Sequence, residues 1–135
     1  MKILIDTNVL LDFLQQRESF AEAEEILSLC GRNKVQGFVA AHSFPNMFFI
    51  LRKYMDSAKR RDLLFYLTSL LGVVSMDYLK ILSALSRADF NDFEDCLQDE
   101  CAAEIKADFI VTRNTDDFKN SMVPAITPAA FLKTL

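Results

Sequence analysis

Short apolar segments alternate with helical patterns along the whole chain, and this alternation most constrains the fold. The segments that resemble buried strands are Lys2–Ile5, Gln36–Ala41, Gly72–Met76 and Asp108–Thr112, with Val123–Ile126 as a fifth candidate. Strands that alternate with helices form right-handed βαβ crossovers and a parallel sheet covered on both faces. We therefore predict an α/β fold, a three-layer α/β/α sandwich with a mainly parallel sheet of four to five strands.

Polar residues with capping chemistry mark where the intervening helices begin. A Ser, Asp, Asn or Thr side chain can accept a hydrogen bond from the first free backbone N–H groups of a helix. The predicted caps, in chain order, are Ser19, Ser43, Ser57, Asp77, Asn91 and Thr127. Another helical pattern begins at Thr7.

The composition fits one globular domain over residues 1–135. Hydrophobic residues make up 51% and charged residues 25%, which excludes disordered and fibrous classes. The apolar runs are far shorter than the roughly 18 residues of a membrane span, and the N-terminus lacks a secretory signal pattern, so we expect a cytoplasmic protein with no membrane partner. The three cysteines form no C-x-x-C pair and are expected to be small buried hydrophobes.

Charge is unevenly distributed along the chain, although the net charge is only −4. Between Asp89 and Glu104 there are seven carboxylates and no Lys or Arg, and the rest of the chain carries 15 basic against 12 acidic residues. The acidic stretch is either a solvated helix face or part of a functional site.

Acidic residues also follow two of the predicted strands. Asp6 follows the first strand, and Asp117 lies in the polar stretch after the fourth. Because ligands bind at the carboxyl ends of strands in open parallel sheets, we expect both at one rim. On the helix within the acidic stretch, Asp92, Asp95 and Asp99 fall within an arc of about 60°, which predicts a ladder of carboxylates.

These carboxylates predict a divalent metal site. Ionised carboxylates about 5–6 Å apart repel by about 3 kcal/mol at an effective dielectric near 20, so gathering them requires a compensating cation. Oxygen-only ligands suit Mg²⁺ or Mn²⁺. The alternative is that Asp92 and Asp99 are simply solvated and that Asp6 caps the helix after it.

Three segments of the sequence resemble the signature blocks of the PIN domain family of metal-dependent ribonucleases. They are Ile3–Asp12 (ILIDTNVLLD), Asp92–Gln98 (DFEDCLQ) and Ile110–Phe118 (IVTRNTDDF). The resemblance covers nearly the whole chain. It implies a Rossmann-like α/β/α sandwich and an endoribonuclease activity on RNA, and members of the family include toxins paired with an antitoxin protein.

The resemblance also implies the roles of several acidic residues. The first family aspartate matches Asp6, and the helix aspartate matches Asp95, with Asp92 as a helper one turn earlier. The last acidic position falls on Asn114 or Asp117, and we favour Asp117.

Two further residues follow from the same comparison. Thr112 is expected to place its hydroxyl in the site. Family members usually carry a glutamate in the helix after the second strand, but here the segment Ser43–Phe49 contains no acid, and Asn46 occupies the nearest place. Asparagine adds no negative charge, so we expect weaker metal binding; the alternative function is a PIN-like nucleic-acid or protein binding module that has lost catalysis.

Basic residues are expected to contact the RNA phosphates. The candidates are Arg113, Arg17 and Lys53. His42 is a candidate base, although a histidine between a strand and a helix is more often a cap or packing group.

Phenylalanines on amphipathic helices, namely Phe48, Phe49 and Phe65, either pack in the core or cover a homodimer contact, and the resemblance favours a homodimer. A phosphotransfer domain with Asp6 as nucleophile is a further alternative, weakened by Asn8 at a position where an aspartate is expected.

Overall fold

The computed structural model describes residues 1–135 and contains one five-stranded sheet, parallel throughout, in the order β3-β2-β1-β4-β5. The strands are β1 (Lys2–Ile5), β2 (Gln36–Ala40), β3 (Gly72–Val74), β4 (Phe109–Val111) and β5 (Ala125–Ile126). The α-helices are α1 (Thr7–Leu14), α2 (Phe20–Gly31), α3 (Ser43–Ile50), α4 (Ser57–Leu70), α5 (Tyr78–Leu85), α6 (Phe93–Glu104) and α7 (Pro128–Lys133). Short 3-10 helices, η1 (Leu51–Lys53) and η2 (Thr115–Phe118), complete the fold.

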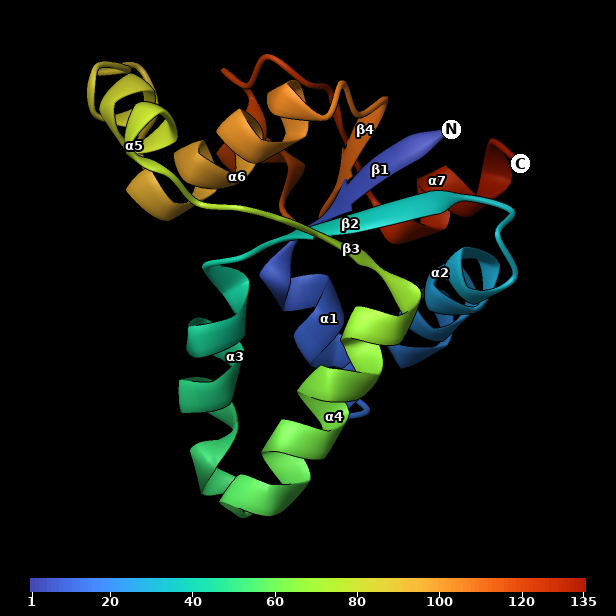
Figure 1. The fold of residues 1–135 in the computed structure, drawn as a ribbon. Helices are drawn as coiled ribbons and strands as arrows, with labels where there is room; N and C mark the ends of the chain where they lie inside the picture. Colours follow the sequence, from blue (N-terminus) through green and yellow to red (C-terminus); the bar gives the residue numbers. More distant parts are fainter.

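Helices cover both faces of the sheet, as the alternating pattern predicts (Figure 1). Ile3 and Ile5 of β1 pack into the larger core, which also contains residues of α1, α2, α4 and α7. Leu4 points to the opposite face and packs with residues of α5 and α6. Successive residues of a strand face opposite sides, so this one apolar strand serves both cores. The three-layer prediction is confirmed.

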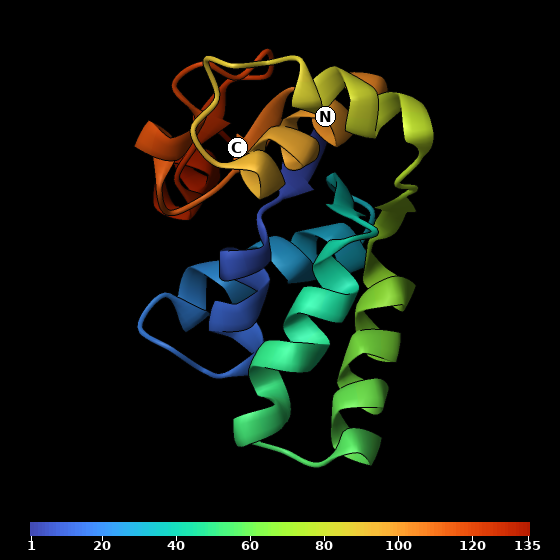
Figure 2. The same ribbon diagram turned by 90° about the vertical axis from the view of Figure 1, so that its left-hand side faces the viewer.

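Helices α3 and α4 run side by side and extend away from the sheet (Figure 2). None of the helices is both long enough and apolar enough to span a membrane. The three cysteines are buried and unpaired, as predicted.

The strand order reverses between β1 and β4. From β1 the chain builds β2 and β3 on one side, and then crosses to place β4 and β5 on the other. Ile5 pairs with Val111 in the β1–β4 register, so both strands end at the same level. A crevice opens at such a switch point because consecutive crossovers leave in opposite directions.

Two predicted caps are wrong by one residue. Asp56 replaces Ser57 and Asp92 replaces Asn91, each accepting the N–H three residues on, at 2.8 and 2.9 Å. A carboxylate is also stabilised by the positive end of the helix, which favours aspartate over a neutral neighbour.

The other predicted caps divide into two groups. Asp77 and Thr127 cap their helices as predicted. Ser19 occupies the N-cap position without a side-chain hydrogen bond, and Ser43 lies inside α3, where its hydroxyl bonds to that of Thr7 at 2.7 Å. The strands are also up to two residues shorter than predicted.

The predicted ladder of Asp92, Asp95 and Asp99 is not a single solvent-facing row. Asp99 is fully buried and accepts from Arg87 at 2.7 Å and from the backbone N–H groups of Met122 and Val123 at 2.9 and 3.1 Å. The segment after η2 packs over this part of α6 and supplies those N–H groups. Asp99 therefore anchors the helix to the protein rather than facing a ligand.

We expect Arg87→Met to lower the free energy of unfolding by about 3 kcal/mol, because it leaves the Asp99 carboxylate buried without its counter-ion. Arg32→Met is the matched control: Arg32 pairs with Glu25 at 3.6 Å on the surface, and its loss should cost less than about 1 kcal/mol. Urea unfolding of the three proteins measures both values. Equal effects of the two substitutions would show that the buried pair does not anchor α6.

Candidate active site

The ends of β1 and β4 place Asp6 and Thr112 beside each other. Asp6 is 3% exposed, and Thr112 is fully buried. The Thr112 hydroxyl donates to Asp6 Oδ2 at 2.8 Å, and the side-chain amide of Gln98, on α6, donates to Asp6 Oδ1 at 2.9 Å. Asp6 occupies the N-cap position of α1 but makes no capping hydrogen bond, so the alternative role as a helix cap is wrong.

A polar cavity of about 430 Å³ opens beside Asp6. Acidic side chains from β1, α6 and η2 share it, and no Lys or Arg lines it. The complete lining is Asp6, Thr7, Asn8, Asn46, Phe49, Ile50, Asp92, Glu94, Asp95 and Asp117. The structure thus brings together Asp6, Asp92, Asp95 and Asp117, which the sequence predicts as one site, together with Asn46.

Two carboxylates in this cavity, Asp95 and Glu94, have a raised pKa. Burial and then the charges of Asp92, Asp6, Asp117 and Glu94 raise the pKa of Asp95 to about 7. Asp95 lies in the first turn of α6, where a helix normally stabilises negative charge. Desolvation and repulsion outweigh that stabilisation at Asp95, so a positive charge in the cavity would favour its ionised form.

Glu94 adds a fifth carboxylate that the sequence interpretation did not assign to the site. Burial raises the pKa of Glu94, a hydrogen bond with the Asn46 side chain opposes this, and the charges of Asp92 and Asp6 raise it further. Asn46 and Glu94 therefore come from α3 and α6 to meet at one cavity wall. Glu94 belongs to the same acidic segment as Asp95, but only the contact with α3 distinguishes it from the solvated acids around it.

The oxygen donors of the cavity fit Mg²⁺ or Mn²⁺. No three His, Cys, Asp or Glu side chains converge into a preassembled all-protein metal cluster. Mg²⁺ retains several waters and is commonly bound through one or two carboxylates, so close convergence of three ligands is not required. The residues that would hold the ion are Asp6, Asp95 and Asp117, with Asp92 beside them.

Both arginines predicted to bind RNA, Arg17 and Arg113, form ion pairs with one buried carboxylate. Asp12, 1% exposed on α1, lies 2.9 Å from the Nε atoms of both Arg17 and Arg113. Arg17 also donates to the carbonyl of Asn8. These pairs hold the segment after α1 and the segment after β4 to the same helix. Both guanidinium groups remain more than one-third exposed.

The remaining predicted residues lie outside the cavity. The backbone N–H of Asn114 donates to Thr112 Oγ at 3.1 Å, but Asn114 does not line the cavity. Lys53 is exposed in η1 at the end of α3. Burial lowers the pKa of His42, and the backbone of Glu94 opposes this.

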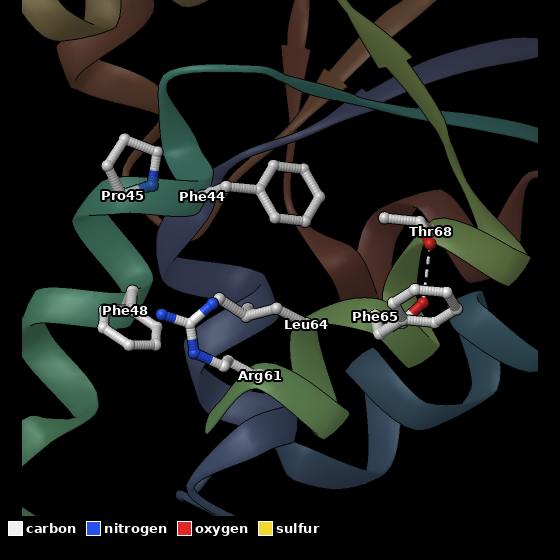
Figure 3. A pocket seen from close by; sticks show the side chains of 7 residues that line it. All are labelled: Phe44, Pro45, Phe48, Arg61, Leu64, Phe65 and Thr68. Carbon is white, nitrogen blue, oxygen red and sulfur yellow. Dashed lines mark hydrogen bonds between the residues drawn. The ribbon is translucent and has the colours of Figure 1, made fainter. Parts of the chain in front are cut away.

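A second cavity, of about 520 Å³ between α3 and α4, has a different character (Figure 3). It is lined by Phe44, Pro45, Phe48, Arg61, Leu64, Phe65 and Thr68. Arg60 and Arg61 lie over the ring of Phe48, with their guanidinium carbons 4.1 and 5.5 Å from its centroid. It contains no acidic side chain and is not a metal site.

Gln98 is the main functional residue that the sequence interpretation missed. It lies one turn after Asp95 on α6, and this i, i+3 spacing was a usable signal for a shared helix face. The donor role is visible only when β1 and α6, 92 residues apart in sequence, are packed together.

The fold is similar to chains of several solved structures, one of which is a toxin–antitoxin complex. A chain of VapBC-1 from nontypeable Haemophilus influenzae has a TM-score of 0.73 and 14% identity, covering 96% of this chain and 99% of that one. A chain of VapBC2 from Rickettsia felis, bound to a promoter DNA fragment, has a TM-score of 0.71 and 14% identity, and the match covers 94% of this chain and 98% of that one. A chain of a toxin–antitoxin complex from Klebsiella pneumoniae has a TM-score of 0.70 and 20% identity, and the match covers 93% of this chain and 97% of that one.

The search of curated protein sequences finds no match. The family model for the PIN domain matches residues 2–116, a range that includes both strands of the switch point and every acidic residue of the cavity except Asp117. This match, together with the five-stranded parallel fold, shows that the chain belongs to the PIN domain family.

Proposed function

We propose that this protein is an endoribonuclease dependent on Mg²⁺ or Mn²⁺, and the toxin of a toxin–antitoxin pair. PIN domains are generally nucleases that depend on a divalent metal, which supports a nuclease-type toxin. The observation that carries the proposal is the cavity at the β1–β4 switch point, where four further carboxylates and no basic residue surround Asp6, whose own carboxylate is hydrogen-bonded at both oxygens.

In this proposal the side chains of the cavity have different roles. Asp6, Asp95 and Asp117 would hold the ion, with Asp92 as a helper, and Thr112 orients Asp6. A bound divalent ion supplies an activated water and neutralises the charge that develops on the phosphodiester oxygens. Arg113, at the end of β4, keeps an exposed guanidinium that can contact an RNA phosphate, and exposed Lys53 is a second candidate.

We further propose an antitoxin as a protein partner, because the similar structures are toxin–antitoxin complexes. The alternative function, a PIN-like binding module with lost catalysis, draws support from the absence of an acid at Asn46. The two functions differ in one measurement, since a binding module retains RNA without cutting it.

We expect purified protein to cleave at least one of several structured and unstructured RNAs with Mg²⁺ or Mn²⁺ and to stop when the metal is chelated. Asp6→Asn and Asp95→Asn should each reduce cleavage more than about 100-fold, above the 10–100-fold typical of outer-shell partners of a metal. Asp62→Asn, an exposed change on α4, is the matched control. Cleavage that survives both cavity substitutions would refute the proposal, and RNA bound but uncut throughout would favour the binding module.

Glu94 supplies the negative charge that Asn46 lacks, according to this proposal. Both residues line the cavity and contact each other. A carboxylate acts on a cation mainly through charge and distance, so it can come from α6 instead of α3.

We expect Glu94→Gln to weaken Mn²⁺ binding about tenfold, a change of about 1.4 kcal/mol. Adding Asn46→Glu to that variant should restore the affinity, because the charge returns to the same cavity wall from the other helix. Isothermal titration with Mn²⁺ measures both effects without RNA. Asp116→Asn, which removes a neighbouring acid outside the cavity, is the control; an equal loss in that variant would show that only overall charge matters.

We also propose a homodimer that uses the exposed face of α5. This helix buries only Lys80 and Ala84, whereas Leu79 and Leu85 are 73% and 65% exposed. A row of exposed apolar side chains on one short helix is typical of an association surface. The sequence predicts that Phe48, Phe49 and Phe65 either pack in the core or cover a homodimer contact, and Phe65 on α4 is 78% exposed.

Sedimentation velocity is expected to show a dimer of the native chain and a monomer of the double variant Leu79→Asp, Leu82→Asp, because two buried charges would be left unpaired in the interface. Phe65→Asp tests whether any exposed apolar residue gives this result. A monomer in the native chain, or dissociation by Phe65→Asp alone, would contradict the assignment to α5.

A further inference from the structure

We propose that Gln98 is a positioning residue that fixes the Asp6 carboxylate for metal binding, an inference that rests on the proposed function. Gln98 is 1% exposed, and its Nε2 donates to Asp6 Oδ1 at 2.9 Å. It does not line the cavity, so it acts through Asp6 and touches neither the ion nor RNA.

Asp6 is held at both oxygens by donors from different elements. Thr112 donates to Oδ2 at 2.8 Å from the end of β4. The hydroxyl of Thr112 in turn accepts the backbone N–H of Asn114 at 3.1 Å, so its own proton is committed to Asp6. Two donors at two oxygens fix the plane of the carboxylate, while each oxygen keeps a lone pair for a further partner.

Packing alone does not require an amide at position 98. Its other amide atom, Oε1, is buried without a hydrogen-bond partner. Burying an unpaired carbonyl oxygen costs free energy, and an apolar side chain of similar size would avoid that cost. Of the other buried residues of α6, Cys96, Leu97, Cys101 and Ala102 are small or apolar, and the one charged residue, Asp99, is paired with Arg87. The hydrogen bond to Asp6 is the one contact that requires an amide here.

A carboxylate fixed before the ion arrives loses less rotational freedom on binding. Outer-shell hydrogen bonds of this kind typically change metal affinity 10–100-fold. Gln98 therefore raises metal affinity while adding little to the stability of the metal-free fold, and these two effects can be measured separately.

The test compares Gln98→Met with the native chain by isothermal titration with Mn²⁺ and by thermal melting without metal. We expect the dissociation constant for Mn²⁺ to rise 10–100-fold, with the metal-free melting temperature changed by only a few degrees. Gln15→Met is the matched control, because Gln15 also carries a buried, unpaired Oε1 but lies outside the cavity, and its Mn²⁺ affinity should equal that of the native chain. If Gln98→Met does not fold, Gln98→Leu replaces it.

A second arm tests the shared target. Thr112→Val removes the other donor to Asp6, and combining it with Gln98→Met should weaken Mn²⁺ binding by a factor that differs from the product of the two single effects, because both act on one carboxylate. Native affinity in Gln98→Met, or a fall in melting temperature with unchanged affinity, would overturn the role of Gln98 alone. A native chain that does not bind Mn²⁺ would overturn the proposed metal dependence and this inference together.

Discussion

Repulsion among carboxylates at the end of β1 and β4 is the constraint around which the functional part of this structure is arranged. Five acidic side chains share one cavity without a basic neighbour, and burial together with the charges of the other acids raises the pKa of Asp95 to about 7. Such an arrangement lowers the stability of the metal-free protein, since ionising Asp95 costs more in the fold than in the unfolded chain. A fold retains that cost where the same carboxylates gain a cation.

The parallel sheet determines where the repulsion occurs. Because β1 and β4 are adjacent and end at the same level, the residues that follow them, Asp6 and Thr112, meet at the switch point. Helix α6 then brings Asp95 and Gln98 over the same edge. The buried pair of Arg87 and Asp99 holds the far part of this helix, so the acidic first turn is presented on an anchored element.

Electrostatic pairing elsewhere separates structural acids from functional ones. Asp99 and Asp12 are more deeply buried than the cavity acids, but each has arginine partners. The cavity acids have none. Buried acids with a counter-ion anchor the fold, whereas the unpaired acids of the cavity are the ones that we propose bind an external cation.

Much of this could be predicted from local sequence. Apolar segments four to six residues long, separated by capped helices, are sufficient to predict the three-layer parallel fold. The rim rule depends only on strand ends and groups Asp6 with Asp117, whereas helical spacing and the family resemblance add Asp95. Cap positions were less certain, since Ser57 and Asn91 each stand beside an aspartate that competes for the same N–H groups.

The sequence by itself determined the order of strands and helices and the supply of carboxylates near strand ends, because both follow from short-range periodicity. Only the tertiary structure decided which carboxylates face the cavity. Asp99 and Asp95 are four residues apart on one helix, yet the loop packed over Asp99 gives it N–H donors and Arg87, after α5, pairs with it, whereas the charged neighbours of Asp95 are other acids. The pairing of Gln98 with Asp6, and of Asn46 with Glu94, likewise depends on contacts between elements that no local pattern encodes.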